Sequence, residues 1–217
     1  MKSVLVIGLG RFGRHMALKF MALGNEVFAI DTKENIVNDI AADLTRAEIG
    51  DCTREAYMSS LGVRDFDLCV CAIGDNFQAS LEIVALLKDL GAQFIVARAH
   101  SEVHEKFLLR NGADAVIYPE RETSENGAVQ YSMDNIFDYI DLGDDYSIVE
   151  IPTPKRWIGR SIIELDVRSK FGISILAAKR DNRLSPTISP KHLFDPDESL
   201  IIMGRLEDVQ ALSRDWA

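Results

Sequence analysis

The sequence predicts an α/β protein, with a parallel sheet in its first half and a smaller α+β region in its second. Over the first 119 residues, short apolar runs alternate with helix-sized amphipathic segments. This alternation is typical of strand–helix–strand units with parallel strands. After residue 145 the helical segments become shorter, and prolines and turn residues separate the strands. The 217 residues are enough for one medium and one small domain.

Six apolar runs are expected to form the parallel strands. They lack polar alternation, as strands covered on both faces do. The first helix is predicted by Phe12, Met16, Phe20 and Leu23, which recur on one helical face. Six strands are the size of a doubly wound, Rossmann-like sheet. The predicted strands are Val4–Ile7, Val27–Ile30, Arg46–Ile49, Leu68–Ile73, Phe94–Ala97 and Ala115–Tyr118.

The residues after the sixth strand predict a long helix and then a small domain. Apolar residues recur with a loose helical period over 120–142, so we expect one helix there with an apolar face. Strands are expected at 147–151, 173–178 and 200–203, and helices at 161–170 and 205–214. The predicted domains are 1–123, a crossover helix and linker over 124–144, with a boundary near Gly143–Asp145, and 145–217.

Composition excludes several classes of protein. The chain has 24 basic and 34 acidic residues, a net charge of −10, which argues against nucleic-acid binding because that requires a basic surface. No stretch approaches the roughly 18 apolar residues of a membrane-spanning helix. Cys52, Cys69 and Cys71 are too few for a disulfide framework and are expected to be core residues in a reducing cytosol. His100 and His104 are expected on an exposed helix surface.

A glycine-rich turn predicts a nucleotide site. The segment Gly8–Gly13 reads G-x-G-x-x-G between a predicted strand and a predicted helix, and Asp31 ends the next strand. Gly8 permits the tight turn, Gly10 lets the backbone approach a pyrophosphate, and Gly13 allows close packing. The helix amides then hold phosphates. Asp31 would accept hydrogen bonds from ribose hydroxyls and repel a 2′-phosphate, which disfavours NADP.

Charged residues at other strand ends are expected near the same cleft. Arg11 places a cation beside the phosphates and suits a ligand with terminal phosphates. Asp51 and Asp75 follow the third and fourth strands, where they either line the cleft or cap the next helices. Arg98 ends the fifth strand and Glu120 follows the sixth, so both are candidates for the cleft.

The order of these motifs resembles the RCK (also called KTN) family, which regulates potassium transport. The resemblance is closer to the KtrA type than to the TrkA type. It rests on the glycine motif, Asp31, Gly50–Thr53, Ala72–Asn76, Gly112–Asp114 before Tyr118–Glu120, Tyr139–Leu142 and Leu200–Gly204.

The resemblance implies a regulatory protein and not an enzyme. It implies that the first domain binds ATP or ADP, with NAD(H) in some relatives. Pairs of first domains would share the crossover helix, and homodimers would form an octameric ring. The ring would sit on the cytosolic face of the membrane, on a potassium-conducting subunit of the KtrB or TrkH type. In some relatives the second domain binds cyclic di-AMP.

The resemblance also implies roles for individual residues. Arg11 would contact the terminal phosphates of ATP, Asp31 the ribose, and Glu120 a Mg²⁺ or Ca²⁺ ion near the γ-phosphate; no catalytic residue is implied. Lys33 departs from the asparagine-like residue of the family and is given no role. Ile162, Ile163, Arg168 and Pro190 lie in segments comparable to the cyclic di-AMP site. The implied nucleotide-binding residues are Gly8, Gly10, Arg11, Phe12, Gly13, Asp31, Asp51, Cys52, Ile73, Gly74, Arg98 and Glu120.

Two other functions are weighed against this one. An NAD-dependent oxidoreductase would need a catalytic acid or base, but the sequence has no Tyr-x-x-x-Lys and no nucleophile–histidine pattern. A stand-alone nucleotide or redox sensor that represses transcription would need a DNA-binding segment. The acidic charge and the lack of a helix-turn-helix signal weigh against that alternative.

Overall fold

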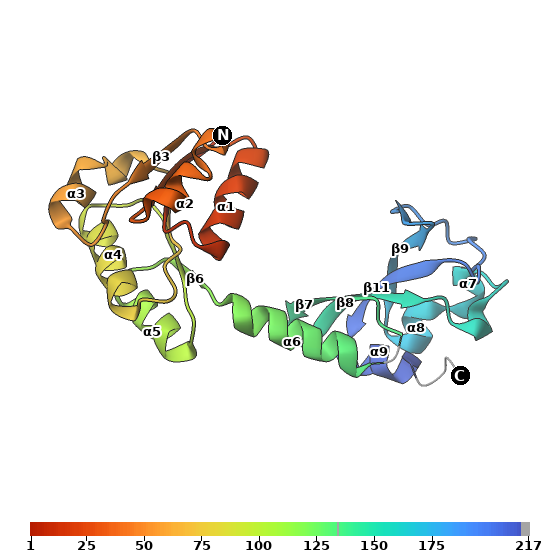
Figure 1. The fold of residues 1–217 in the computed structure, drawn as a ribbon. Coiled ribbons are helices and arrows are strands. Elements are labelled where there is room, and N and C mark those ends of the chain that lie inside the picture. The colour runs from red at the N-terminus through yellow and green to blue at the C-terminus, as the bar shows by residue number, and fades with distance from the viewer. Residues whose placement is uncertain (134, 214–217) are drawn as a thin grey trace. The chain divides into compact units, whose positions relative to one another are not determined.

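The computed structural model describes residues 1–133 and 135–213 and divides the chain into two compact units, Met1–Glu120 and Arg121–Ala217 (Figure 1). Each unit has its own sheet and its own hydrophobic core. Within the described residues, no helix is both long and apolar enough to cross a membrane.

The sheet of the first unit has six parallel strands in the order β3-β2-β1-β4-β5-β6. This is the doubly wound order, in which the direction of winding reverses between β1 and β4. The six predicted strands are confirmed, with small shifts at their ends. They are β1 (Ser3–Ile7), β2 (Glu26–Asp31), β3 (Arg46–Ile49), β4 (Leu68–Cys71), β5 (Ile95–Arg98) and β6 (Ala115–Ile117).

Helices cover both faces of this sheet, which explains the unbroken apolar runs of its central strands. Leu5 and Ile7 pack on one face with α3, α4 and α5, whereas Val4 and Val6 pack on the other with α1 and α2. The edge strand β3 is an exception, because Ile49 is 48% exposed. The helices are α1 (Arg11–Ala22), α2 (Glu34–Asn38), α3 (Glu55–Ser60), α4 (Phe77–Asp89) and α5 (Glu102–Arg110), with 3₁₀ turns η1 (Ala41–Asp43) and η2 (Val63–Asp65).

The prediction of a helix over 120–142 is wrong for the residues after Ser132. Helix α6 covers Pro119–Ser132, Asn135 has a positive φ of 65°, and β7 begins at Asp138. Ile136, expected on an exposed helix face, is buried in the core of the second unit. Residues 143–145 all have positive φ and form the hairpin turn between β7 and β8. Pairing with β8 overrides the loose helical period.

The second unit is the expected α+β structure, with an antiparallel sheet in the order β10-β9-β11-β8-β7. Its core surrounds the fully buried Trp157, whose ring lies against Phe171 and Phe194. The helix expected over 161–170 is split at Asp166, which has a φ of 48°. The elements are β7 (Asp138–Gly143), β8 (Tyr146–Pro152), η3 (Lys155–Trp157), α7 (Ile162–Leu165), α8 (Val167–Phe171), β9 (Ser174–Arg180), β10 (Arg183–Ser185), β11 (Ser199–Arg205) and α9 (Leu206–Ser213).

Candidate functional site

A cleft of about 960 Å³ opens at the carboxyl ends of the parallel strands in the first unit. Ligands of doubly wound sheets bind at this edge, next to the point where the strand order reverses. Each residue that the sequence analysis assigns to the nucleotide site lines this cleft, except Gly13. The tertiary structure therefore brings together residues from the ends of five strands and the start of α6.

The glycine turn leaves the start of α1 open to the cleft. Gly8 has a φ of 93°, and a Cβ atom at Gly13 would overlap the carbonyl oxygen of Gly8, so both positions require glycine. Among the described residues, no side chain caps α1 and its first turn has no acidic residue. In contrast, Asn76 and Ser101 cap α4 and α5. The first amides of α1 are therefore left for another acceptor.

Asp31 links the end of β2 to the glycine turn. Its Oδ2 accepts a hydrogen bond of 2.7 Å from the backbone amide of Leu9, and its Oδ1 accepts one of 2.9 Å from the amide of Lys33. This structural role is additional to the ribose contact expected from the sequence. Each carboxylate oxygen still has a further lone pair that can face the cleft.

Asp51 and Asp75 do not cap helices, so that alternative is wrong. The N-cap positions of α3 and α4 are Arg54 and Asn76. Asp51 instead accepts hydrogen bonds from the hydroxyl and amide of Thr53, at 2.6 and 3.1 Å, and these lower its pKa. Both aspartates line the cleft.

Cys52 also lines the cleft, but as an apolar group. It is 3% exposed, and burial raises the pKa of its thiol to about 12. The thiol is therefore neutral at physiological pH, and it is neither a nucleophile nor a metal ligand in this state.

Arg98 and Glu120 form an ion pair at the cleft. The Nη2 atom of Arg98 lies 2.7 Å from Oε1 of Glu120, and their side chains are 17% and 55% exposed. The bond from its own backbone amide and the contact with Arg98 lower the pKa of Glu120. The described residues contain no group of three or more histidine, cysteine or acidic side chains placed to hold a metal. Glu120 would therefore have to share a cation with groups of the ligand.

Two basic residues of the cleft have no role in the sequence analysis, which does not name His15 and leaves Lys33 unassigned. His15 lies one helical turn after Arg11, and Lys33 follows Asp31 by two residues, so their spacing to the motif could have indicated them. The prediction that His100 and His104 are both exposed is wrong for His104, which is fully buried against Ser80.

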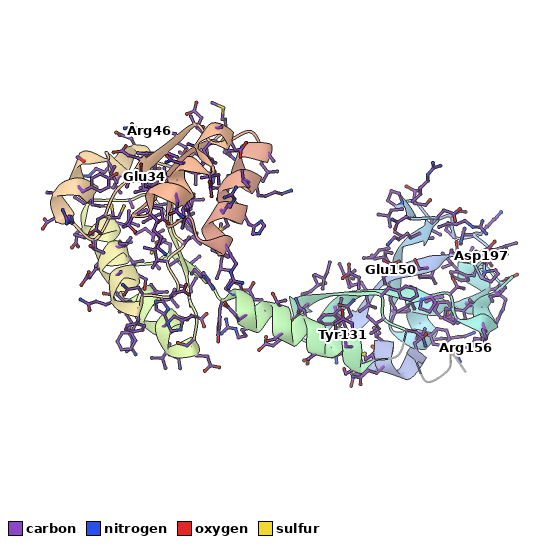
Figure 2. The ribbon with its side chains drawn as sticks, in the orientation of Figure 1. Glu34, Arg46, Tyr131, Glu150, Arg156 and Asp197 are labelled. Atoms are coloured by element: carbon purple, nitrogen blue, oxygen red, sulfur yellow. The ribbon has the colours of Figure 1, made fainter. Side chains whose placement is uncertain are left out.

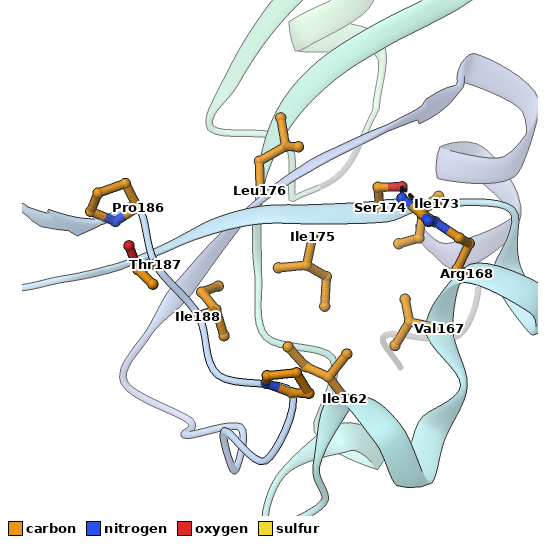
Figure 3. A pocket seen from close by; sticks show the side chains of 11 residues that line it. Ile162, Val167, Arg168, Ile173, Ser174, Ile175, Leu176, Pro186, Thr187 and Ile188 are labelled. Atoms are coloured by element: carbon orange, nitrogen blue, oxygen red, sulfur yellow. Dashed lines mark hydrogen bonds between the residues drawn. The ribbon is translucent and has the colours of Figure 1, made fainter.

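A second cavity, of about 400 Å³, lies in the second unit (Figure 3). Arg168 is its basic side chain, and Nε and Nη2 each donate at 3.3 Å to the Ser174 hydroxyl. Of the four residues that the resemblance places in segments comparable to the cyclic di-AMP site, Ile162, Arg168 and Pro190 line this cavity, whereas Ile163 does not and is 61% exposed. Its other lining residues are Val167, Ile173, Ser174, Ile175, Leu176, Pro186, Thr187 and Ile188.

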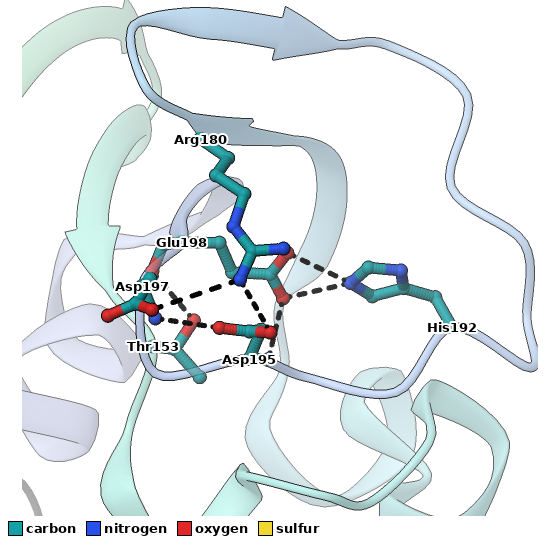
Figure 4. Close-up of polar contacts among 6 residues, drawn as sticks. All are labelled: Thr153, Arg180, His192, Asp195, Asp197 and Glu198. Carbon is teal, nitrogen blue, oxygen red and sulfur yellow. Dashed lines mark hydrogen bonds and ion pairs between the residues drawn. The ribbon is translucent and has the colours of Figure 1, made fainter.

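A polar cluster holds the end of the loop that forms one wall of this cavity (Figure 4). The carboxylate of Glu198, whose side chain is 6% exposed, lies 2.8 Å from Nε2 of His192 and accepts a bond from the amide of Asp195. Arg180 pairs with Asp195 at 2.7 Å, and Thr153 donates through its amide and hydroxyl to the carbonyl of Glu198. Residues 192–198 are thereby fastened to the sheet.

Comparison with solved structures gives the fold of the chain. The GsuK RCK domain is 16% identical, with a TM-score of 0.69, over 100% of this chain and 48% of that one. The GsuK channel bound to NAD is also 16% identical, with a TM-score of 0.68, over 100% of this chain and 39% of that one. The Shewanella denitrificans Kef CTD in AMP bound form is 28% identical, with a TM-score of 0.52, over 60% and 79% of the two chains.

Comparison of sequences gives the family. The TrkA-N domain matches residues 4–119 and the TrkA-C domain matches residues 146–215. Ktr system potassium uptake protein A of Bacillus subtilis is 39% identical over 209 residues, covering 96% of this chain and 94% of that protein. Protein C of the same system and organism is 36% identical over 213 residues, covering 98% and 96%. The chain belongs to the TrkA-N/TrkA-C (RCK) domain family and is a homologue of the Ktr system potassium uptake proteins.

Proposed function

We propose that this chain is the nucleotide-binding regulatory subunit of a Ktr-type potassium uptake system. The observation that carries the proposal is the start of α1, which is uncapped among the described residues and opens into the cleft beside Arg11. An uncapped helix N-terminus with a neighbouring cation suits phosphate groups. The relatives named as potassium uptake proteins support the physiological role.

The ligand we propose is ATP or ADP. Arg11, Lys33 and Arg98 bring positive charge to the cleft of a chain whose net charge is −10, and Asp31 can accept from ribose hydroxyls. The AMP-bound Kef domain supports an adenine nucleotide. A cleft of about 960 Å³ also has room for NAD(H), which stays the alternative ligand.

Gating requires a contact that distinguishes ATP from ADP, because a ligand shifts a conformational equilibrium only by its differential affinity. The two nucleotides differ at the γ-phosphate. We assign that contact to Arg11 and to a Mg²⁺ or Ca²⁺ ion bound between the phosphates and Glu120. Magnesium is commonly held by one or two carboxylates together with phosphate oxygens. The regulated partner would be a membrane subunit of the KtrB or TrkH type, reached from the cytosol by an octameric ring of dimers.

Calorimetry with ADP and ATP tests the cleft. Asp31→Ala removes the ribose acceptor and should weaken ADP binding about tenfold, the cost of one or two lost hydrogen bonds. Arg11→Ala should keep ADP affinity within about threefold and remove the preference for ATP. Arg14→Ala is the matched control, because Arg14 lies on the same helix outside the cleft and contacts the carbonyl of Asp39. Unchanged ADP affinity in Asp31→Ala would show that the cleft is not the site.

Potassium flux into liposomes that carry the membrane subunit tests the regulatory role. The unmutated protein should give different fluxes with ATP and with ADP, and Arg11→Ala should make the two fluxes equal. Glu120→Gln should remove the dependence of the ATP response on Mg²⁺ or Ca²⁺. Equal fluxes with both nucleotides in the unmutated protein would contradict the regulatory role. The nucleotide would then be only a structural cofactor of the cleft.

We further propose that the cavity of the second unit binds cyclic di-AMP. Its lining is mainly apolar, and Arg168 supplies a cation for a phosphate. Arg168→Ala should weaken cyclic di-AMP binding at least tenfold in calorimetry, whereas Arg183→Ala, on β10 and outside the cavity, should not. Equal affinities of the two variants would contradict this assignment.

A further inference from the structure

We propose that Arg98 exchanges its partner when the cleft is filled. Arg98 pairs with Glu120 at the start of α6, and a phosphate group that binds in the cleft takes the guanidinium and releases Glu120. This inference rests on the proposed nucleotide site and adds a regulatory contact to it. It concerns a pair of residues that lie 22 positions apart in the sequence.

The contact joins the sheet to the first turn of α6. Arg98 is the last residue of β5, and Glu120 is the second residue of α6. The guanidinium is largely buried, with 17% of the side chain exposed, whereas 55% of the Glu120 side chain is exposed. Arg98 is thus the anchored partner and Glu120 the one that can move away.

The Arg98 guanidinium has hydrogen-bond donors that Glu120 does not use. It carries five N–H groups, of which Nη2 serves Glu120. Its Nε atom is buried and has no hydrogen-bond partner among the described residues. A buried N–H group without an acceptor is unfavourable, so an acceptor that entered the cleft would be stabilised there.

Gly74 and Phe12 place this guanidinium beside the glycine turn. A Cβ atom at Gly74 would lie 2.9 Å from Cζ and Nη1 of Arg98, so a side chain at position 74 would occupy the space that the guanidinium uses. On its other side, Cζ lies 5.6 Å from the centre of the Phe12 ring. Phe12 follows Arg11 in the first turn of α1, where we place the phosphates. Arg98 therefore lies next to the proposed phosphate position.

Charge makes the two partners of Arg98 competitors. A nucleoside diphosphate brings at least two negative charges close to the Glu120 carboxylate, and like charges at short distance repel. Arginine binds phosphate with two parallel N–H groups, a stronger contact than one with a single carboxylate oxygen. The phosphate is therefore expected to displace Glu120 from the guanidinium of Arg98. The Glu120 carboxylate can then bind a divalent cation.

A double-mutant cycle tests the exchange, with ADP as the probe and EDTA present. Arg98→Gln should weaken ADP binding about tenfold. Glu120→Gln should strengthen it about three- to fivefold, the range of a partly exposed ion pair, because the competitor is lost. In the Arg98→Gln background the gain from Glu120→Gln should be smaller, because only the repulsion between the Glu120 carboxylate and the phosphates is then removed. Arg98→Lys keeps the charge without the planar fork and should fall between Arg98→Gln and the unmutated protein.

The chain offers a matched control pair. Arg46 and Glu48 form an ion pair of 2.8 Å within β3, and neither residue lines the cleft. Arg46→Gln and Glu48→Gln, alone or together, should leave ADP affinity unchanged. A change of ADP affinity equal to that of the Arg98 variants would assign the effect to the net charge of the chain.

Hydrogen exchange gives a readout independent of affinity. Saturating ADP should speed amide exchange in the early turns of α6 in the unmutated protein, and Arg98→Gln should show the faster exchange without ADP. Three outcomes would each contradict the proposed change of partner. The effects in the double-mutant cycle could be additive, or Glu120→Gln could weaken ADP binding. Amide hydrogen exchange in α6 could also respond neither to ADP nor to Arg98→Gln. Failure of the unmutated protein to bind any adenine nucleotide would instead overturn the proposed function, and the exchange with it.

Discussion

His104 lies on α5 and has no exposed surface. Its ring is fully buried between α4 and α5, and Nε2 lies 2.7 Å from the Ser80 hydroxyl oxygen. That hydroxyl donates its hydrogen to the carbonyl of Phe77, so it must accept from Nε2–H of the histidine. When the ring is neutral it is therefore the Nε2–H tautomer, and its Nδ1 atom is buried without a hydrogen-bond partner among the described residues.

This burial predicts a loss of stability in mild acid. Desolvation, and then the nearby His100, lower the pKa of His104 in the folded chain. The unfolded chain, with a histidine pKa of about 6.5, binds the proton first, so stability is complete above that pH and falls as pH drops toward the folded-state pKa. The melting temperature should fall between about pH 7.5 and 5.5, and His104→Gln should flatten that dependence.

His15→Gln is the control for this experiment, because His15 is an exposed histidine on α1. It should leave the slope of melting temperature against pH unchanged. A slope that is the same in the unmutated protein and in His104→Gln would mean that His104 has the same pKa in the folded and the unfolded chain.

At the scale of an element, α6 is a helix that draws little support from its own unit. None of its described residues is buried, and Tyr131 is 87% exposed (Figure 2). Gly127 lies in its interior, where an added Cβ atom would meet nothing within 4 Å. Glycine inside a helix costs about 1 kcal/mol relative to alanine, so α6 is a weak helix by its own sequence.

Gly127→Ala should therefore strengthen α6, by about 0.5–1 kcal/mol. Amide exchange of residues 121–132 should slow about two- to fivefold, as the change in free energy implies. The reverse substitution at the next position, Ala128→Gly, should speed it. Faster exchange in Gly127→Ala would indicate that another surface packs closely against this position and is displaced by the methyl group.

At the scale of the whole molecule, apolar surface remains on the second unit. Ile136, which lies in the segment expected to form a helix with an apolar face, is buried in the core and is not part of this surface. Phe137, Ile140 and Leu142 are 55%, 52% and 50% exposed, although they lie in or next to β7. Large apolar side chains exposed close together in the chain are typical of a surface that another molecule covers.

Light scattering should accordingly report a dimer or a larger assembly of the 24.2 kDa chain. Replacing Ile140 by lysine would place a charge on the exposed side of β7 and should reduce the molar mass if this face contributes. A single 24 kDa species of the unmutated protein at micromolar concentration would contradict the expectation. Circular dichroism of the variant checks that its sheet is kept.

Much of the first unit could be predicted because its signals are local and repeated. The central strands β1, β2 and β4 are buried on both faces, so each of them is a continuous apolar run in the sequence. The glycine turn could be located because Gly8 and Gly13 have no steric alternative. Strand order then places the ends of those strands at one edge, so the cleft residues come together without any further signal.

What the tertiary structure decided depends on partners distant in sequence. The loose helical period over 120–142 predicts a helix, yet β7 gains backbone hydrogen bonds from β8 that a helix would forgo. Ser80 and Phe77 bury His104, and Glu120 takes up a hydrogen bond of Arg98, across separations of 24 and 22 residues. The periodic elements and the glycine turn could be predicted from neighbouring residues, because burial and backbone sterics act locally. The limits of α6, the buried histidine and the ion pair could not, because each depends on a contact between residues far apart in the chain.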